Sequence, residues 1–118
     1  MSELSIIQQI QNSEEIVSFF GYWPTFHDDT LEDLSHDFKN KKITVTLSSQ
    51  EKISHWTFEF SNISSLIVQD REEKWKDKTI IFGIEIKKEN DDFIFEIEPS
   101  MGSYIKITSK VIRVKKLF

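Results

Sequence analysis

The chain has 118 residues, a net charge of −5 and no cysteine, which fits one domain and excludes disulfides, zinc–thiolate sites and cysteine nucleophiles. The negative charge disfavours nucleic-acid binding, which depends on neutralising phosphates. The first twenty residues contain no Lys or Arg and no apolar run reaches about 20 residues, which argues against a signal peptide and a membrane span. We therefore expect a single cytoplasmic domain over residues 1–118, without a nucleic-acid or membrane partner.

Residues 1–21 have the pattern of an amphipathic helix. Apolar residues recur there at three- and four-residue spacing, at Leu4, Ile7, Ile10, Val17 and Phe20. Asn12 with Glu15 three residues later resembles a capping box, so one helix or two short segments are both compatible with the pattern. Gly21 is suited to end the helix in a left-handed conformation.

Residues 22–29 form an aromatic turn motif. Pro24 lacks the amide donor that a helix needs, so the chain must turn here. A rigid aromatic loop of this kind either plugs a core or forms a binding surface. We single out as candidate binding residues Tyr22, Trp23, Phe26, His27 and Asp28.

Residues 30–118 alternate apolar and polar side chains in short runs, which predicts antiparallel strands. The predicted strands cover residues 31–38, 43–47, 56–61, 66–68, 80–86, 93–97, 104–108 and 111–114. Asn40-Lys41 is predicted as a two-residue hairpin loop, and residues 90–92 as a second turn. The expected fold class is therefore α+β, with the N-terminal helix packed on a mostly antiparallel sheet of seven or eight short strands.

Trp75 lies in the charged segment 71–78, which reads as a short helix or an exposed loop. A Trp in such a place is either an interface anchor or a lid packed on the core, and we include Trp75 as the sixth candidate binding residue. Acidic residues are frequent from residue 70 to residue 98, but lysines are interspersed, as on an ordinary solvated face. The net charge nevertheless permits a basic protein partner.

His27, Asp28 and Asp29 are the most chemical-looking cluster. Neighbouring residues of an extended segment point to opposite faces, so the three cannot converge on one metal ion without a bend. The alternative role of His27 and Asp28 is to hydrogen-bond the backbone of the Trp-Pro turn and fix its shape. The chain has no Gly-x-Ser-x-Gly elbow and no glycine-rich phosphate loop. We therefore predict no catalytic residue, metal or cofactor; a small enzyme or metal-binding domain centred on His27 and Asp28 is the alternative.

The run from Phe20 to Asp28 contains Gly-x-Trp-Pro-x-Phe-His-Asp and resembles the signature of the immunity protein 50 family of bacterial proteins. In that family a short helix leads into the motif, and strands follow. The resemblance implies a non-catalytic immunity protein that binds and neutralises a cognate toxin in a polymorphic toxin system. Homo-oligomerisation through exposed edge strands is a further possibility that the strand-rich pattern leaves open.

Overall fold

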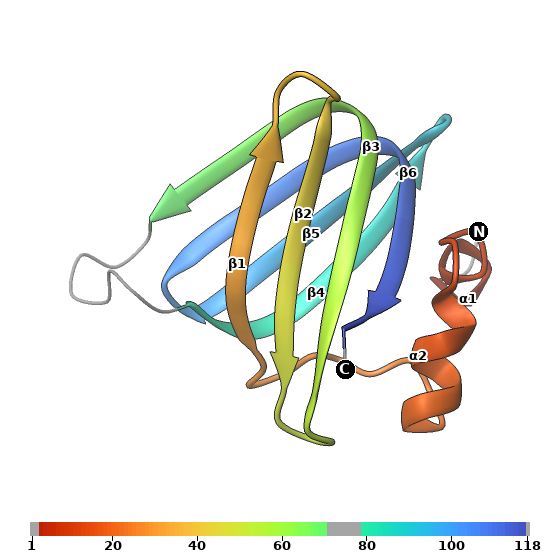
Figure 1. Cartoon of the computed structure of the whole chain (residues 1–118), viewed down its shortest axis with the longest axis vertical. Coiled ribbons are helices and arrows are strands. Elements are labelled where there is room, and N and C mark those ends of the chain that lie inside the picture. The colour runs from red at the N-terminus through yellow and green to blue at the C-terminus, as the bar shows by residue number, and fades with distance from the viewer. Residues whose placement is uncertain (1–2, 71–78, 118) are drawn as a thin grey trace.

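The computed structural model describes residues 3–70 and 79–117, and these residues form two short helices and six strands (Figure 1). The helices are α1 (Glu3–Ile7) and α2 (Ser13–Phe20). The strands are β1 (Thr30–Asp37), β2 (Lys42–Ser49), β3 (Ser54–Asp70), β4 (Thr79–Glu89), β5 (Asp92–Met101) and β6 (Ser103–Lys116). Neither helix is long and apolar enough to cross a membrane.

The strands form a closed antiparallel barrel in the order β1-β2-β3-β6-β5-β4. Closure depends on a short pairing of β1 with β4, in which Thr30 lies opposite Ile80 and Leu31 opposite Thr79. Strand β6 comes last in the sequence but lies between β3 and β5. Its ladder with β3 is the longest in the barrel.

The predicted α+β fold with seven or eight short strands is wrong, because the described residues form a mainly antiparallel sheet of six long strands. Two pairs of predicted strands are single strands. Segments 56–61 and 66–68 both belong to β3, which bends at Asn62 (φ 54°) and at a register shift between Ile63 and Ser65. A bulge of this kind bends a strand without ending its ladder.

The second merged pair is segments 104–108 and 111–114, which both lie in β6. Ser109 and Lys110 between them look like a turn in the sequence, but Ser109 is fully buried and paired with both Ile63 and Phe93. The polar residue therefore continues the strand instead of ending it.

The N-terminal segment contributes two short helices in place of a long helix covering a sheet face. Asn12 precedes α2 in the left-handed conformation, and its side-chain amide donates to the Val114 carbonyl (3.4 Å) instead of capping the helix. The break is confirmed, but the capping box is not formed. Gly21 (φ 88°) ends α2 and donates its N–H to the Val17 carbonyl, as predicted.

Gln11, between the two helices, is bonded to the outer edge of β6. Its N–H donates to the Ile112 carbonyl and its carbonyl accepts from the Val114 N–H, both at 2.9 Å. This short parallel bridge joins the N-terminal segment to the barrel.

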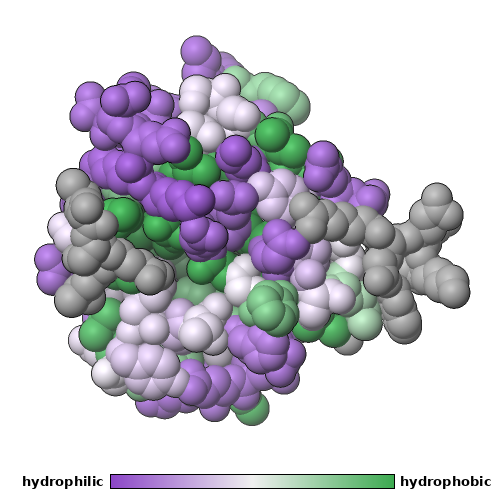
Figure 2. All heavy atoms as spheres, turned by 180° about the vertical axis from the view of Figure 1, so that it is seen from behind, coloured by the Kyte–Doolittle hydropathy of each residue, from purple (hydrophilic) through white to green (hydrophobic). Residues whose placement is uncertain are grey.

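The barrel interior is filled by inward-facing aromatic and branched side chains, to which the N-terminal segment adds Ile6, Ile10 and Ile16. The largest fully buried side chains of the strands include Trp56, Phe58, Phe60 and Phe95. Viewed from behind, the surface carries several separate apolar patches among polar side chains (Figure 2).

The β1–β2 turn also differs from its prediction. Asp37 pairs with Lys42, which leaves a four-residue loop in place of Asn40-Lys41 alone. Lys41 takes the positive φ (53°), while the Asp37 carboxylate accepts from the backbone and side-chain amides of Asn40. The turn after β4 is confirmed, since Asn90 (φ 57°) and Asp91 connect β4 to β5.

Candidate functional site at the barrel end

The aromatic turn motif runs between α2 and β1, and two of its aromatic residues point into the barrel. Phe26 is only 3% exposed. Trp23 is half-buried, and both rings meet Phe58 edge-to-face, with centroid distances of 5.8 Å for Phe26 and 6.4 Å for Trp23. Trp23 and Phe26 therefore close the end of the core. Their predicted contact with a partner stays a prediction.

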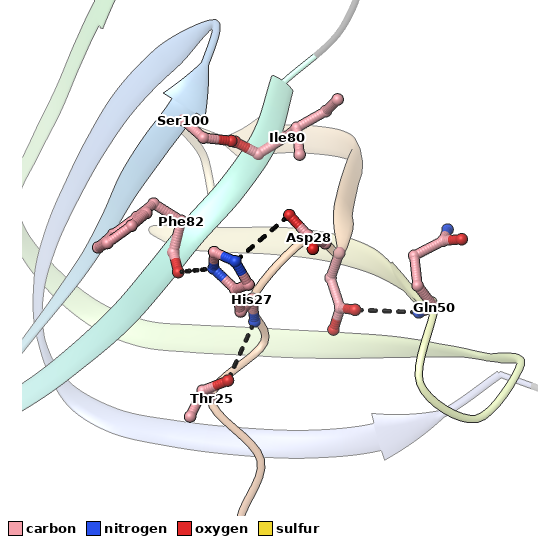
Figure 3. A network of polar contacts seen from close by, with 8 residues as sticks. Thr25, His27, Asp28, Gln50, Ile80, Phe82 and Ser100 are labelled. Carbon is pink, nitrogen blue, oxygen red and sulfur yellow. Dashed lines mark hydrogen bonds and ion pairs between the residues drawn. The ribbon is translucent and has the colours of Figure 1, made fainter.

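The other three candidates of the motif, Tyr22, His27 and Asp28, are exposed. His27 Nδ1 lies 2.9 Å from the Phe82 carbonyl oxygen, and its Nε2 lies 3.5 Å from the Asp28 carboxylate (Figure 3). Because a carbonyl oxygen only accepts, Nδ1 must carry the proton. In neutral His27 the Nε2 atom beside Asp28 is then the acceptor of the ring.

Backbone hydrogen bonds to β4 hold the motif in an unusual conformation. Phe26 (φ 63°) and Asp28 (φ 66°) are both left-handed, which is uncommon for residues other than glycine. The Asp28 N–H donates to the Ile81 carbonyl, and the Ile81 N–H donates to the Asp29 carbonyl, both at 2.8 Å. Together these bonds set Phe26 inward and His27 outward.

Asp29 is the carboxylate that fixes the turn through a backbone hydrogen bond. The sequence predicts this role for His27 and Asp28 and not for Asp29. Its side chain is buried and accepts the Gln50 N–H at 3.0 Å, which ties the motif to the β2–β3 loop. Burial raises the pKa of Asp29, while the Gln50 hydrogen bond opposes the rise. The buried position and the bond to a distant loop indicate a structural carboxylate.

A small cavity of about 280 Å³ opens beside the motif. It is lined by Tyr22, Pro24, Thr25, Phe26, His27, Asp29, Ser49 and Glu51. The Tyr22 hydroxyl donates to the Glu51 carboxylate, and this hydrogen bond raises the pKa of Tyr22. The cavity thus has a phenol, an imidazole and a carboxylate at its rim.

A second hollow, of about 300 Å³, is lined by Phe82, Gly83, Ile84, Glu85, Glu96 and Glu98. Phe82 joins it to the first cavity, because its ring meets the His27 ring edge-to-face at 5.4 Å. Strict alternation along the predicted strand 80–86 would place Phe82 on the same face as Ile80 and Ile84. Register shifts between Ile80 and Gly83 instead bury Ile81 and leave Phe82 59% exposed.

The two hollows together form one surface, which we call the aromatic–acidic surface. It consists of Tyr22, His27, Asp28, Glu51, Phe82, Glu85, Glu96 and Glu98. Of the six candidate residues, Tyr22, His27 and Asp28 lie on it, and Trp75 lies outside the described residues. Sequence reasoning missed Glu51 and Phe82, which come from a loop and a strand distant in the chain.

The described residues contain no group of three His, Asp or Glu side chains that could hold a metal ion. His27 has one ring nitrogen already engaged by a backbone carbonyl. What the arrangement does offer is a set of exposed rings among carboxylates, held in place by backbone hydrogen bonds.

No family model matches the sequence, and no curated protein matches it either. The fold is similar to the crystal structure of an uncharacterized protein from Neisseria gonorrhoeae, with a TM-score of 0.60 and 20% sequence identity. The match covers 77% of this chain and 93% of that protein. At this level of identity the likeness concerns the fold alone.

Proposed function

We propose that the chain is a non-catalytic immunity-type protein, which binds and neutralises a cognate bacterial toxin through the aromatic–acidic surface. The observation that carries the proposal is the exposure of the His27 and Phe82 rings in contact with each other on this surface. Exposed aromatic rings with few rotatable bonds are typical anchors of protein interfaces. The resemblance of the motif to immunity proteins supplies the kind of partner.

The charge of this surface favours a basic partner. Five carboxylates surround the rings, those of Asp28, Glu51, Glu85, Glu96 and Glu98. Glu85 is paired with Lys87 at 3.2 Å, and Glu96 accepts from the Tyr104 hydroxyl. Opposite charge on the partner would speed the encounter and select against acidic proteins.

The surface is also ordered before any partner arrives. The backbone bonds between the motif and β4 and the Asp29–Gln50 bond fix the loop that carries His27. A preorganised surface loses less conformational entropy on binding, so more of its contact energy appears as affinity.

The test starts with a pull-down by the purified protein from lysate of its own host and identification of what is retained by mass spectrometry. The affinity of the retained partner is then measured for His27→Ala and Phe82→Ala. We expect Phe82→Ala to weaken binding by about 2 kcal/mol, roughly thirtyfold, as for an interface anchor.

The chain offers a matched control in a second His–Phe pair. The His36 and Phe38 rings stack at 4.1 Å on the β1–β2 hairpin, away from the motif, and Phe38 is exposed. His36→Ala and Phe38→Ala should therefore leave the affinity unchanged. Equal losses in both pairs would contradict the proposed surface.

The immunity activity itself needs a protection assay. Co-expression with the toxic product of a neighbouring gene should rescue growth, and Phe82→Ala should reduce the rescue. A protein that binds no such product and protects no cell would refute the proposal. A divalent metal that co-purifies with the wild type and is lost in folded His27→Ala would favour the alternative, an enzyme or metal-binding domain centred on His27 and Asp28.

A further inference from the structure

The barrel contains several strand edges that lack a neighbouring strand among the described residues. Beyond Leu31, β1 is paired with β2 alone. On β4 the turn motif bonds to Ile81, and beyond Ile81 the strand is paired with β5 alone. Both stretches are rich in charge: β1 carries Glu32, Asp33 and Asp37, and β4 carries Glu85, Lys87, Lys88 and Glu89. Charged side chains on an edge oppose pairing with another chain.

The end of β6 is protected differently. Its last residues extend beyond the ladder with β5, but Gln11 occupies the outer edge through its bonds to Ile112 and Val114. The N-terminal segment thus supplies the missing neighbour.

The second half of β3 has neither protection. Strand β2 pairs with β3 only as far as Ser61, so in the described part of the chain segment 63–70 pairs with β6 alone. Figure 1 shows this end of β3 projecting past the β1–β2 hairpin. No residue from Ile63 to Gln69 is charged and none is proline. Such a bare edge is the kind at which strands of other chains add.

The later side chains of this edge are exposed on both faces of the sheet, whereas Ile63 and Leu66 are partly buried against the core. Ile67 is 39% exposed and Val68 is 52% exposed. Because successive residues of a strand point to opposite faces, neither face is covered at this point. Alternate residues also direct their N–H and carbonyl groups away from β6, where a further strand could form hydrogen bonds with both groups.

We propose that this segment of β3 binds a second copy of the chain. The two β3 edges pair antiparallel about a twofold axis at Ile67, which joins the two barrels through a continuous sheet. In this register Leu66 lies opposite Val68 of the second copy, and Ser65 lies opposite Gln69. The segment is complementary to itself, because apolar residues meet apolar ones and no like charges face each other.

A pairing of this length buries less surface than the roughly 1,200 Å² of a stable interface, so the dimer is weak and depends on concentration. Gel filtration with light scattering should show the mass rising from 14.0 kDa towards twice that value as the concentration increases about a hundredfold. Ile67→Lys places two like charges on the axis and should weaken dimerisation at least tenfold, while the circular dichroism of the monomer is unchanged.

Ile53→Lys is the matched control. Ile53 is 90% exposed in the loop before β3, so the same substitution adds the same charge away from the edge. It should dimerise like the wild type. A wild type that is monomeric at every concentration, or a dimer that Ile67→Lys leaves intact, would overturn the proposal.

The absence of cysteine permits a second test. In the proposed register Ile67→Cys brings two thiols opposite each other, at Cα separations of about 4.5–5.5 Å that a disulfide can span. Mild oxidation should then give a covalent dimer at least tenfold faster than in Ile53→Cys. Equal rates in the two variants would contradict the axis at Ile67.

Discussion

Phe26 allows the packing and the backbone of the turn motif to be tested separately. Its ring is 3% exposed and lies edge-to-face against Trp23 (5.7 Å) and Phe58 (5.8 Å). Replacing a buried Phe with Ala removes transfer energy and leaves a cavity, at a cost of about 3–5 kcal/mol. A domain of this size is stable by about 5–15 kcal/mol, so Phe26→Ala should be folded but much less stable.

The positive φ of Phe26 (63°) makes a comparison with glycine informative. Phe and Ala both carry a Cβ, so the cost of the left-handed conformation, about 1–2 kcal/mol, is common to both and cancels. Glycine avoids that cost but gains freedom in the unfolded chain, worth about 0.4–1 kcal/mol. Phe26→Gly should therefore be more stable than Phe26→Ala by about 1 kcal/mol, which reverses the usual order.

Urea unfolding followed by tryptophan fluorescence measures both variants, and unchanged m-values would show that the unfolding transition is the same. If Phe26→Gly proved less stable than Phe26→Ala, the left-handed conformation assigned to the motif would be wrong. If Phe26→Ala cost less than about 1 kcal/mol, Phe26 would not be the plug of the barrel end.

Three further predictions test other parts of the fold. Burial raises the pKa of Asp29 above its ordinary 3.8, so this carboxyl favours folding below the unfolded pKa and loses that contribution as pH rises through the folded value. In urea unfolding, the stability of Asp29→Asn relative to the wild type should therefore increase with pH. A stability difference that stays constant with pH would refute the assignment. The buried Thr57 hydroxyl has no hydrogen-bond partner among the described residues, so Thr57→Val should raise the free energy of unfolding by about 1 kcal/mol. A lower free energy of unfolding in Thr57→Val would mean that the hydroxyl has a hydrogen-bond partner after all. Gly21→Ala should lower the stability by about 1 kcal/mol through its φ of 88° alone, because a Cβ there contacts nothing within 4 Å. Gly83→Ala is the control: its Cβ is equally free of contacts, and thermal unfolding should show no loss of stability.

The strands with strict alternation were predictable from the sequence. Ile43, Val45 and Leu47 of β2 are all buried, as the pattern indicated, because every second side chain of a strand points to the same face. The number of strands was not predictable. Polar residues inside β3 and β6 look like turns, and only long-range pairing shows that the ladder continues through them.

The candidate site was predictable in part. The motif 22–29 was recognised, but its division into Phe26 inside and His27 outside depends on backbone angles that the sequence does not reveal. The exposure of Phe82 was not predictable, because a bulge reverses which face a residue occupies and alternation alone does not show where a bulge lies.

The position of β6 has a consequence for the order in which the barrel can form. Strands β3 and β5 are neighbours in space only through β6, which follows both of them in the chain. During synthesis neither can complete its pairing until β6 has left the ribosome, so both keep an open edge until then. The barrel must therefore close late and through contacts distant in sequence, which favours slow folding and gives unfinished chains time to associate.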